Sequence, residues 1–354
     1  MRKVLIAMSG GVDSSVAAYR MQQQGWDCVG ATMTLYRNED IGLARSRTCC
    51  SLEDVEDARS VAFRLNMPYY VFNFSDEFRC QVMDRFADAY EQGRTPNPCI
   101  DCNRYLKFRQ LYDRAALMGC DAIATGHYAR IEQENGRYLL KKAQDVSKDQ
   151  SYVLYMLTQD QLAHTCFPLG SLHKTEVREI AASQGFFNAR KPDSQDICFV
   201  PDGDYAAFIR RYTGKEDIPG NFVDEAGRVL GRHKGVTHYT VGQRKGLGVP
   251  SNEPLYVKAI DPEANQVVLS GNAALFSRQL TAGDFNWIAW DEPPQQFRCS
   301  AKARYRHPEQ PCQVTVREDD TVEVVFDQPQ RAITPGQAVV LYDGDTVLGG
   351  GTIL

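Results

Sequence analysis

An apolar run directly before two glycines constrains the fold of this chain more than any other feature. Residues 3–9 read KVLIAMS, Gly10 and Gly11 follow, and a helix-forming stretch begins at about Asp13. A continuous apolar run of this length is typical of a strand buried on both faces of a sheet. Such strands belong to parallel sheets covered by helices, so the N-terminus predicts an α/β fold.

The first 200 residues repeat this alternation of strand and helix. We expect further strands over 28–35, 69–74 and 121–129, and helices over about 13–24, 51–66, 76–92 and 104–118. Asp13, Ser14 and Ser15 are candidate caps of the first helix. The alternation predicts a doubly wound parallel sheet, whose ligands bind at the carboxyl ends of the strands. Gly10–Gly11, Thr34 and Gly126–His127 would emerge at that edge.

The pattern changes after about residue 205. Helical periodicity gives way to short alternating runs at 255–260, 266–270, 312–318, 321–326, 338–342 and 346–354, separated by turn residues. This pattern predicts one or two small β domains.

Composition excludes several classes of protein. The chain has 354 residues, a formal net charge of −5 and eleven cysteines. No apolar run approaches the ~20 residues that span a bilayer, and the N-terminal run is too short for a signal peptide. We therefore expect a cytoplasmic protein without membrane contact, whose cysteines are mostly buried thiols such as Cys28 and Cys120. Cys49 and Cys50 receive no role.

The segment SGGVDSS (9–15) admits two interpretations. Glycines before a helix N-terminus let backbone N–H groups approach a phosphate, and Asp13 is a candidate magnesium ligand on that phosphate. The alternative is an ordinary β–α turn. The segment resembles the pyrophosphatase loop of the N-type ATP pyrophosphatases, which implies cleavage of ATP to AMP and pyrophosphate.

A second segment, TPNPCIDCN (95–103), carries two cysteines. We expect a loop between helices, because Pro96 and Pro98 disfavour helix. A C-x-x-C pair can bind zinc, form a redox disulfide, ligate an iron–sulfur cluster or supply one thiolate. Zinc is the weaker interpretation, because no second closely spaced pair exists. Cys198, in KPDSQDICFV, is the other candidate functional cysteine.

Two stretches without acidic residues suggest contact with nucleic acid. Residues 226–252 contain Arg228, Arg232, Lys234, Arg244 and Lys245, and residues 293–308 contain Arg298, Lys302, Arg304 and Arg306. One such stretch is often a solvated surface. Two stretches in an acidic chain favour phosphate binding.

The sequence as a whole resembles the tRNA-specific 2-thiouridylases. The resemblance rests on AMSGGVDSS, GRTPNPCIDCN, ATGHYAR, KDQSYVLY, DSQDICFV, YTVGQRKGLG, ARYRHP and TPGQ, which occur in order. It implies a pyrophosphatase-loop catalytic domain over 1–205, a small central tRNA-binding domain over 206–272 and a C-terminal β-barrel domain over 273–354. The implied reaction replaces the C2 oxygen of the wobble uridine in tRNA with sulfur, using ATP.

The resemblance also implies roles for the cysteines. Cys102 corresponds to the nucleophile and Cys198 to the cysteine that carries a persulfide. The sulfur donor would be a sulfur-relay protein or a cysteine desulfurase that donates a persulfide. An alternative is a [4Fe–4S] cluster on Cys99, Cys102 and Cys198, with one iron open to sulfide.

The remaining site residues are carried over in the same way. Expected to contact ATP are Ala7, Met8, Ser9, Gly10, Gly11, Val12, Asp13, Ser14, Met33 and Gly126. The target base would be enclosed by Asn97, Pro98 and Cys99. Other expected tRNA contacts are His127, Lys148, Asp149, Gln150, Arg304, Tyr305 and Gln337. A lone histidine at a strand end is often structural, and without the resemblance His127 would not stand out.

Overall fold

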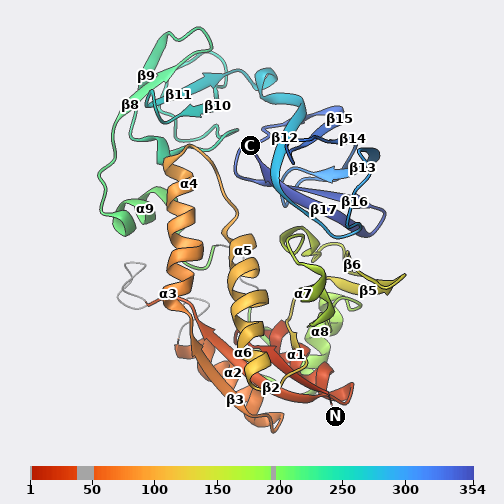
Figure 1. The fold of residues 1–354 in the computed structure, drawn as a ribbon. Coiled ribbons are helices and arrows are strands. Elements are labelled where there is room, and N and C mark those ends of the chain that lie inside the picture. Colours follow the sequence, from red (N-terminus) through yellow and green to blue (C-terminus); the bar gives the residue numbers. More distant parts are fainter. Residues whose placement is uncertain (1, 38–51, 193–196) are drawn as a thin grey trace. The chain divides into compact units, whose positions relative to one another are not determined.

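The computed structural model describes residues 2–37, 52–192 and 197–354, so Cys49, Cys50 and Ser51 lie outside the described residues. The chain divides into two compact units (Figure 1). The first comprises Met1–Val82, Cys99–Gly203 and Gly344–Val347. The second comprises Met83–Pro98, Asp204–Asp343 and Leu348–Leu354.

A five-stranded parallel sheet forms the centre of the first unit, which confirms the predicted fold class. Its strands are β1 (Lys3–Ala7), β2 (Asp27–Thr34), β3 (Tyr69–Asn73), β4 (Ala122–Ala124) and β7 (Thr165–Cys166), in the order β3-β2-β1-β4-β7. Every pairing in this sheet is parallel. The strand order reverses between β1 and β4. In doubly wound sheets this switch point opens a crevice at the carboxyl ends of the strands.

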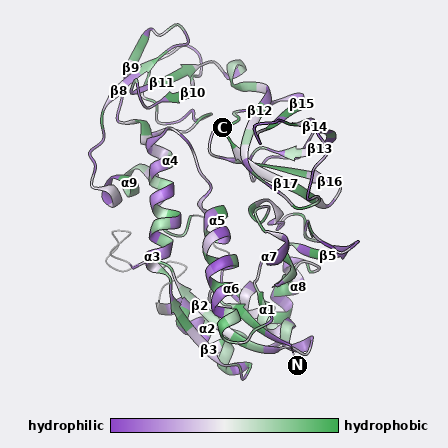
Figure 2. Ribbon diagram, viewed as in Figure 1, coloured by the Kyte–Doolittle hydropathy of each residue, from purple (hydrophilic) through white to green (hydrophobic). Residues whose placement is uncertain are grey.

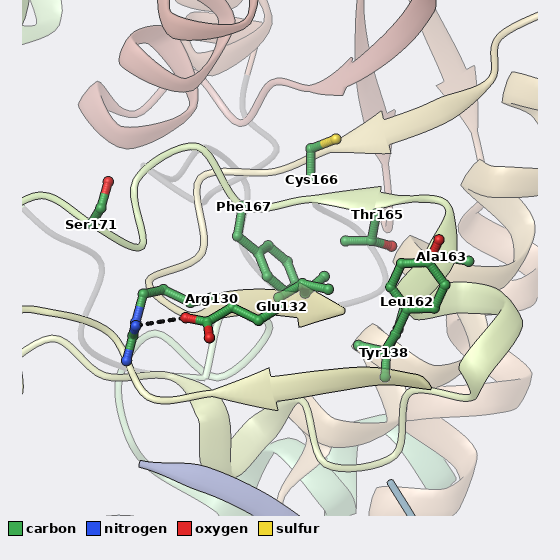
Figure 3. Close-up of a pocket in the computed structure, with 10 residues that line it drawn as sticks. Arg130, Glu132, Tyr138, Leu162, Ala163, Thr165, Cys166, Phe167 and Ser171 are labelled. Atoms are coloured by element: carbon green, nitrogen blue, oxygen red, sulfur yellow. Dashed lines mark hydrogen bonds and ion pairs between the residues drawn. The ribbon is translucent and has the colours of Figure 1, made fainter. Parts of the chain in front are cut away.

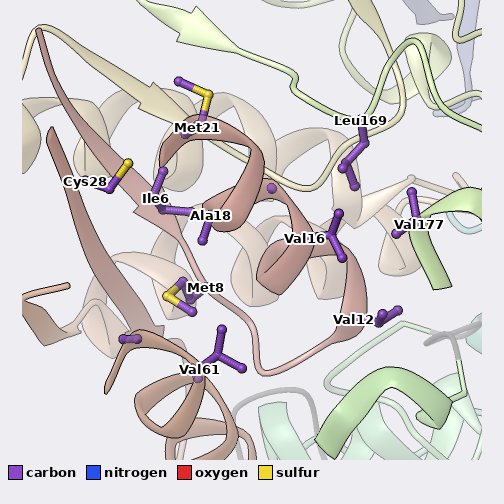
Figure 4. Packing of buried hydrophobic residues seen from close by; sticks show 14 of the residues in the cluster. Ile6, Met8, Val12, Val16, Ala18, Met21, Cys28, Val61, Leu169 and Val177 are labelled. Carbon is purple, nitrogen blue, oxygen red and sulfur yellow. The ribbon is translucent and has the colours of Figure 1, made fainter. Parts of the chain in front are cut away.

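Helices bury both faces of this sheet. Ile6 and Met8 pack against Val16 of α1 (Val12–Gln23), Val61 of α2 (Leu52–Arg64) and Val177 of α8 (Lys174–Ser183) in one core cluster (Figure 4). Leu5 is fully buried and points to the opposite face, because side chains alternate along a strand. The continuous apolar run 3–8 therefore forms the doubly covered strand that it predicts.

The loop predicted over TPNPCIDCN is confirmed for residues 95–97 and wrong from Pro98 onward. Helix α5 (Pro98–Asp101) begins at the second proline and continues through the π-helical segment Cys102–Gln110 into α6 (Leu111–Leu117). Proline is favoured at the first helical position, where its missing N–H has no helical partner in any case. Pro98 therefore starts the helix, and Cys102 lies within it.

Two further predictions need correction. The helix expected over 76–92 is α3 (Ser75–Phe78), a π-helical segment (Arg79–Asp84) and α4 (Arg85–Glu91). The strand expected over 121–129 ends at Ala124, because the residues after it turn toward the β1–α1 loop. The first unit also contains α7 (Gln159–Ala163) and the hairpin of β5 (Arg130–Glu134) and β6 (Arg137–Lys141).

The second unit contains a small four-stranded sheet after helix α9 (Tyr205–Thr213). Its strands are β8 (Gly220–Val223), β9 (Val229–His233), β10 (Tyr256–Asp261) and β11 (Gln266–Ser270), in the order β10-β11-β8-β9. Phe222, Val257 and Val267 are fully buried in its core.

A closed antiparallel barrel completes the second unit and confirms the predicted barrel. Its strands are β12 (Phe276–Trp287), β13 (Gln296–Lys302), β14 (Gln310–Val316), β15 (Val322–Arg331), β16 (Ala338–Asp343) and β17 (Thr346–Ile353). The order is β12-β15-β14-β13-β16-β17, and β12 pairs with β17 to close it. Figure 2 colours the residues by hydropathy, and in β16 every residue except Asp343 is buried.

Within the described ranges, no helix is both long enough and apolar enough to span a membrane.

Candidate active site

The loop between β1 and α1 brings the backbone close to its neighbours. Gly10 has a φ of +72°, and a Cβ at this position would lie 2.4 Å from the carbonyl oxygen of Asp54. Only glycine fits both constraints. The predicted caps are wrong, because the N-cap of α1 is Gly11, which has no side chain. The first-turn N–H groups of α1 are thus not capped by a side chain, and such groups favour anions.

The expected ATP-contacting residues gather at this loop. Ala7 ends β1, residues 8–14 form the loop and the first turn of α1, and Met33 lies near the end of β2. Gly126 follows β4, and a Cβ on it would lie 2.8 Å from the backbone nitrogen of Ser14. The backbone after β4 therefore lies against the first turn of α1, at the switch point of the sheet.

A lysine that the sequence reasoning missed holds Asp13. The ammonium group of Lys174 lies 2.7 Å from Oδ1 and 2.8 Å from Oδ2 of Asp13. The hydroxyl of Tyr128 donates a further hydrogen bond of 2.8 Å to Oδ1. The Lys174 side chain is 10% exposed. Nothing in the local sequence marks Lys174, because its distance from Asp13 along the chain hides the pair.

A second missed group braces the same loop. Asn188 donates through Nδ2 to the carbonyl oxygen of Gly10 at 3.0 Å and to Ser15 Oγ at 2.9 Å. Lys191 bridges Asp54 at 2.6 Å and Asp57 at 2.7 Å. These contacts hold the segment 188–191 against α2 and against the loop between β1 and α1 (residues 8–11), which we call the glycine loop.

Cys102 is buried at the start of the π-helical segment, with 8% of its surface exposed. Burial raises the pKa of its thiol to about 11, while the nearby positive charge of Lys107 opposes that rise. A buried thiol with a raised pKa holds little thiolate at neutral pH. Cys102 therefore needs a change in its surroundings to act as a nucleophile.

His127 is packed as a structural residue. Its Nδ1 lies 2.8 Å from the hydroxyl of Thr125, and its ring contacts Phe108 and Phe167. Burial, and secondarily the charge of Lys107, lowers its pKa well below the usual value. The imidazole is therefore neutral at physiological pH.

Cys198 is half-buried and anchored through its backbone. The hydroxyl of Tyr36 donates a hydrogen bond of 2.7 Å to the carbonyl oxygen of Cys198. Tyr36 stands two residues after the end of β2 and packs on Phe78, which in turn contacts Phe199. Cys198 is thus tied to the carboxyl end of β2, the sheet edge at which the glycine loop emerges.

The structure does not assemble a metal site from the cysteines. Among the described residues, which include Cys99, Cys102 and Cys198, no three His, Cys, Asp or Glu side chains are grouped closely enough to hold a metal ion. Cys99 is exposed, whereas Cys102 is buried. The three thiols as placed do not fit a shared cluster. Cys28 and Cys120 are buried, as predicted.

Comparison with known proteins identifies the family. The chain matches the families described as tRNA methyl transferase HUP domain (residues 2–202), tRNA methyl transferase PRC-barrel domain (206–271) and Aminomethyltransferase beta-barrel domain (277–353). It is 52% identical to the tRNA-specific 2-thiouridylase MnmA of Lachnoclostridium phytofermentans, over 100% of both chains. It is 50% identical to the protein of that name from Clostridioides difficile, over 99% of this chain and 98% of the relative. The chain belongs to the tRNA-specific 2-thiouridylase family.

The 2-thiouridylase positions expected to contact tRNA in the first unit are already engaged with the chain itself. Asp149 accepts hydrogen bonds from the backbone of Ala143 and from the hydroxyl of Ser151. Gln150 exchanges two hydrogen bonds of 2.9 Å with the backbone of Tyr128. Lys148 is half-buried beside them. These hydrogen bonds hold residues 148–150 beside Tyr128, the residue that follows His127.

In the second unit the structure joins two of the expected motifs. Gln337 donates through Nε2 to the carbonyl oxygen of Thr95 at 2.7 Å, and the Thr95 backbone nitrogen donates to the Pro335 carbonyl oxygen at 2.9 Å. Gln337 thereby fixes the segment that leads to Asn97 and Pro98. Of these two, Pro98 is buried and Asn97 is half-buried.

Arg304 is anchored, whereas its neighbour Tyr305 is exposed. The guanidinium of Arg304 donates to the carbonyl oxygen of Val241 at 3.0 Å and to the hydroxyl of Thr334. Tyr305 is 40% exposed on the β13–β14 turn. Arg304 thus positions the turn that carries Tyr305.

A cavity of about 390 Å³ lies outside this set of residues (Figure 3). Its lining comes from the β5–β6 hairpin, the end of α7 and the segment 165–171, and includes the ion pair of Arg130 and Glu132. None of the expected site residues lines it. Phe167 lines the cavity and also contacts the ring of His127.

Proposed function

We propose that this protein uses ATP to replace the C2 oxygen of the wobble uridine in tRNA with sulfur. Full-length relatives about half identical in sequence carry the name tRNA-specific 2-thiouridylase. The observation that carries the proposal is the anchoring of Cys198 by Tyr36 at the sheet edge that also holds the glycine loop. The residues proposed for the ATP step and for the sulfur step then lie at the same edge of the parallel sheet.

The first step is adenylation of the base. The uridine O2 attacks the α-phosphorus of ATP, pyrophosphate leaves, and C2 becomes an electrophile with AMP as its leaving group. The uncapped first turn of α1 and the ammonium of Lys174 provide positive potential for the phosphates. A carboxylate and neighbouring hydroxyls suit magnesium bound with phosphates, so Asp13, Ser9 and Ser14 would hold the ion, which neutralises phosphate charge.

The second step transfers sulfur. The outer sulfur of a persulfide on Cys198 bonds to C2, and the bond from C2 to the oxygen of AMP breaks. Cys102 then attacks Sγ of Cys198, which breaks the sulfur–sulfur bond and leaves a Cys102–Cys198 disulfide. A thiol reductant returns two electrons before the next turnover. In the variant order, Cys102 attacks the persulfide first and releases sulfide, which then attacks C2.

The raised pKa of Cys102 assigns a role to Lys107. Lys107 is the charge that favours the thiolate of Cys102, and its charge also disfavours protonation of His127. We infer that tRNA binding alters the surroundings of Cys102 enough to lower its pKa. The base would enter beside Asn97, Pro98 and Cys99, as base-modifying enzymes take an extruded base into a pocket.

The sulfur donor would be a relay protein or a cysteine desulfurase that places a persulfide on Cys198. The cluster alternative finds no support in the geometry, since the three cysteines are not grouped. We therefore derive no step through a cluster, and iron analysis of anaerobically purified protein tests that alternative directly.

The deciding experiment is mass analysis of tRNA nucleosides after reaction with ATP and a persulfide source. We expect 2-thiouridine from the wild-type protein and from Cys80→Ser, a control at an exposed cysteine. Cys102→Ser and Cys198→Ser should each abolish thiolation while tRNA affinity stays near normal. Thiolation that persists in either variant would overturn the assignment of that cysteine.

A further inference from the structure

Two cysteines outside the candidate active site form a close cross-strand pair. Cys299 of β13 and Cys312 of β14 are directly opposite each other in the antiparallel ladder. Their sulfur atoms lie 3.7 Å apart. Directly opposed residues in antiparallel strands have Cα atoms about 4.5–5.5 Å apart, which is within the range that a disulfide bridges.

The pair lies in the middle of the ladder of the β13–β14 hairpin, between Arg298–Gln313 and Ser300–Pro311. Ser300–Pro311 and Ala301–Gln310 are the next two pairs of the ladder, and the turn beyond them carries Arg304 and Tyr305. Arg304 holds this turn against Val241 and Thr334. A bond between the two sulfurs would therefore close the hairpin below its turn without moving either strand out of register.

The two thiols differ in access. Cys312 is completely buried in the barrel core, whereas Cys299 is half-buried. An oxidant from solution thus reaches Cys299 first, and Cys312 is the neighbour that can resolve the product. This is the arrangement of an entry cysteine beside a resolving cysteine.

We propose that Cys299 and Cys312 form a reversible dithiol–disulfide site that clasps the β13–β14 hairpin. With a peroxide as oxidant, Cys299 becomes a sulfenic acid and one water is released. The Cys312 sulfur then attacks the Cys299 sulfur, a second water leaves, and the disulfide forms. The two thiols lose two electrons and two protons, and the peroxide gains them. A dithiol such as dithiothreitol reverses the reaction.

The environment of the Cys299 thiol determines how fast the disulfide forms. A hydrogen bond that the Cys299 thiol donates to Cys312, followed by burial, raises the pKa of Cys299. Since the thiolate is the reacting form, closure is slow at neutral pH and faster as pH rises. The site stays reduced under mild conditions and closes under sustained oxidation.

The experiment uses the full-length protein treated with hydrogen peroxide, then blocked with iodoacetamide and digested with trypsin. Cleavage at the basic residues separates residues 299–302 from residues 307–317, each of which contains one cysteine. We expect a linked pair of these peptides, formed faster at pH 9 than at pH 7 and lost on reduction. Because the link is read in the wild-type protein, the result does not depend on how any variant folds.

Cys299→Ser and Cys312→Ser should each lack the linked peptides, and the disulfide form should unfold at a higher temperature than the reduced form, since the cross-link restricts the unfolded chain. Oxidation of the exposed Cys80 and Cys99 shows that the treatment was sufficient. If both barrel peptides are then still fully alkylated, or if Cys299 is linked to another cysteine, the proposal is wrong. The outcome is independent of whether the protein thiolates tRNA.

Discussion

Lys174 and Asp13 form a two-pronged ion pair between the first residue of α8 and the first turn of α1, with N–O distances of 2.7 and 2.8 Å. Tyr128 completes the group, since its ring lies 5.8 Å from the ammonium and its hydroxyl bonds Asp13. The pair fixes the carboxylate of the glycine loop before any nucleotide arrives. It also places a cation where phosphates would bind.

Replacing Lys174 should therefore damage both the loop and its chemistry. Lys174→Met leaves the Asp13 carboxylate without its cation, and we expect a loss of about 1–3 kcal/mol in the free energy of unfolding. ATP-dependent AMP formation should fall roughly 100-fold, as for a lost donor to a developing charge. Denaturant unfolding and an AMP-release assay measure the two effects.

The matched control for this change is Lys215→Met. Lys215 pairs with Glu91 at 2.6 Å, but its side chain is 66% exposed. An exposed ion pair contributes little to stability, so the free energy of unfolding and the rate of AMP formation should both stay near the wild-type values. If Lys174→Met and Lys215→Met lost equal amounts of stability and of AMP formation, Lys174 would have no specific role in the site.

A methyl group at Gly126 should disturb the loop through a steric clash. Its Cβ would lie 2.8 Å from the nitrogen of Ser14 and 2.9 Å from the carbonyl carbon of Asp13, and both are backbone atoms. Gly126→Ala should lower the free energy of unfolding by about 1–3 kcal/mol and weaken ATP binding. Gly271→Ala is the control, because a Cβ there meets nothing within 4 Å. Calorimetric titration with ATP distinguishes the two variants.

The thiol of Cys102 should show its raised pKa in alkylation kinetics. With a pKa of about 11, the thiolate fraction grows about tenfold for each pH unit up to that value. The rate of iodoacetamide labelling at Cys102 should rise in parallel between pH 7 and 10. Since Lys107 lowers this pKa, Lys107→Met should slow labelling at each pH, whereas Arg109→Met, an exposed change on the same segment, should not. A labelling rate that levels off near pH 8 would contradict the burial argument.

The fold was predictable where one local pattern decides the structure. The apolar run 3–8, the strand–helix alternation and the alternating β strands each reflect a periodicity of burial. Prediction failed where position within an element matters more than residue type. Pro98 breaks helices in their interior but starts α5 here. Strand β12 went unnoticed because its alternation is interrupted, with a register shift between Gly283 and Asn286.

The candidate site was only partly predictable for a related reason. The glycine loop and the cysteines occur in motifs and can be found by scanning the sequence. Lys174, Lys191 and Asn188 matter because they reach the loop across more than 160 residues of chain. Such contacts arise from the packing of α8 and the residues after it, and no local pattern reports them.

The cations of the acid-free stretch 226–252 differ in whether they form ion pairs with carboxylates. Arg228 forms an ion pair of 2.6 Å with Asp224, just outside the acid-free stretch. Arg244 and Lys245 are exposed, and no carboxylate in the described part of the chain pairs with them. If they meet tRNA phosphates, each should contribute about 0.7–0.9 to the slope of log affinity against log salt. Arg244→Ala and Lys245→Ala should lower that slope in a filter-binding titration more than Arg228→Ala does.

The hydrogen bond from Tyr36 to Cys198 predicts a separation of the two proposed chemical steps. Tyr36→Phe keeps the ring that packs on Phe78 but removes the hydroxyl that holds the carbonyl oxygen of Cys198. The loss of one hydrogen bond costs about 0.5–1.5 kcal/mol, so the protein should remain folded. Cys198 would then be less well positioned, and misplacement of a reacting group by about 1 Å can slow a reaction about 100-fold. Thiolation should therefore fall while AMP formation is nearly unchanged.

Tyr212→Phe, which removes a hydroxyl bonded to Asp84 in the second unit, is the control. Parallel losses of thiolation and AMP formation in Tyr36→Phe would mean that the bond supports the whole loop edge and not the sulfur step.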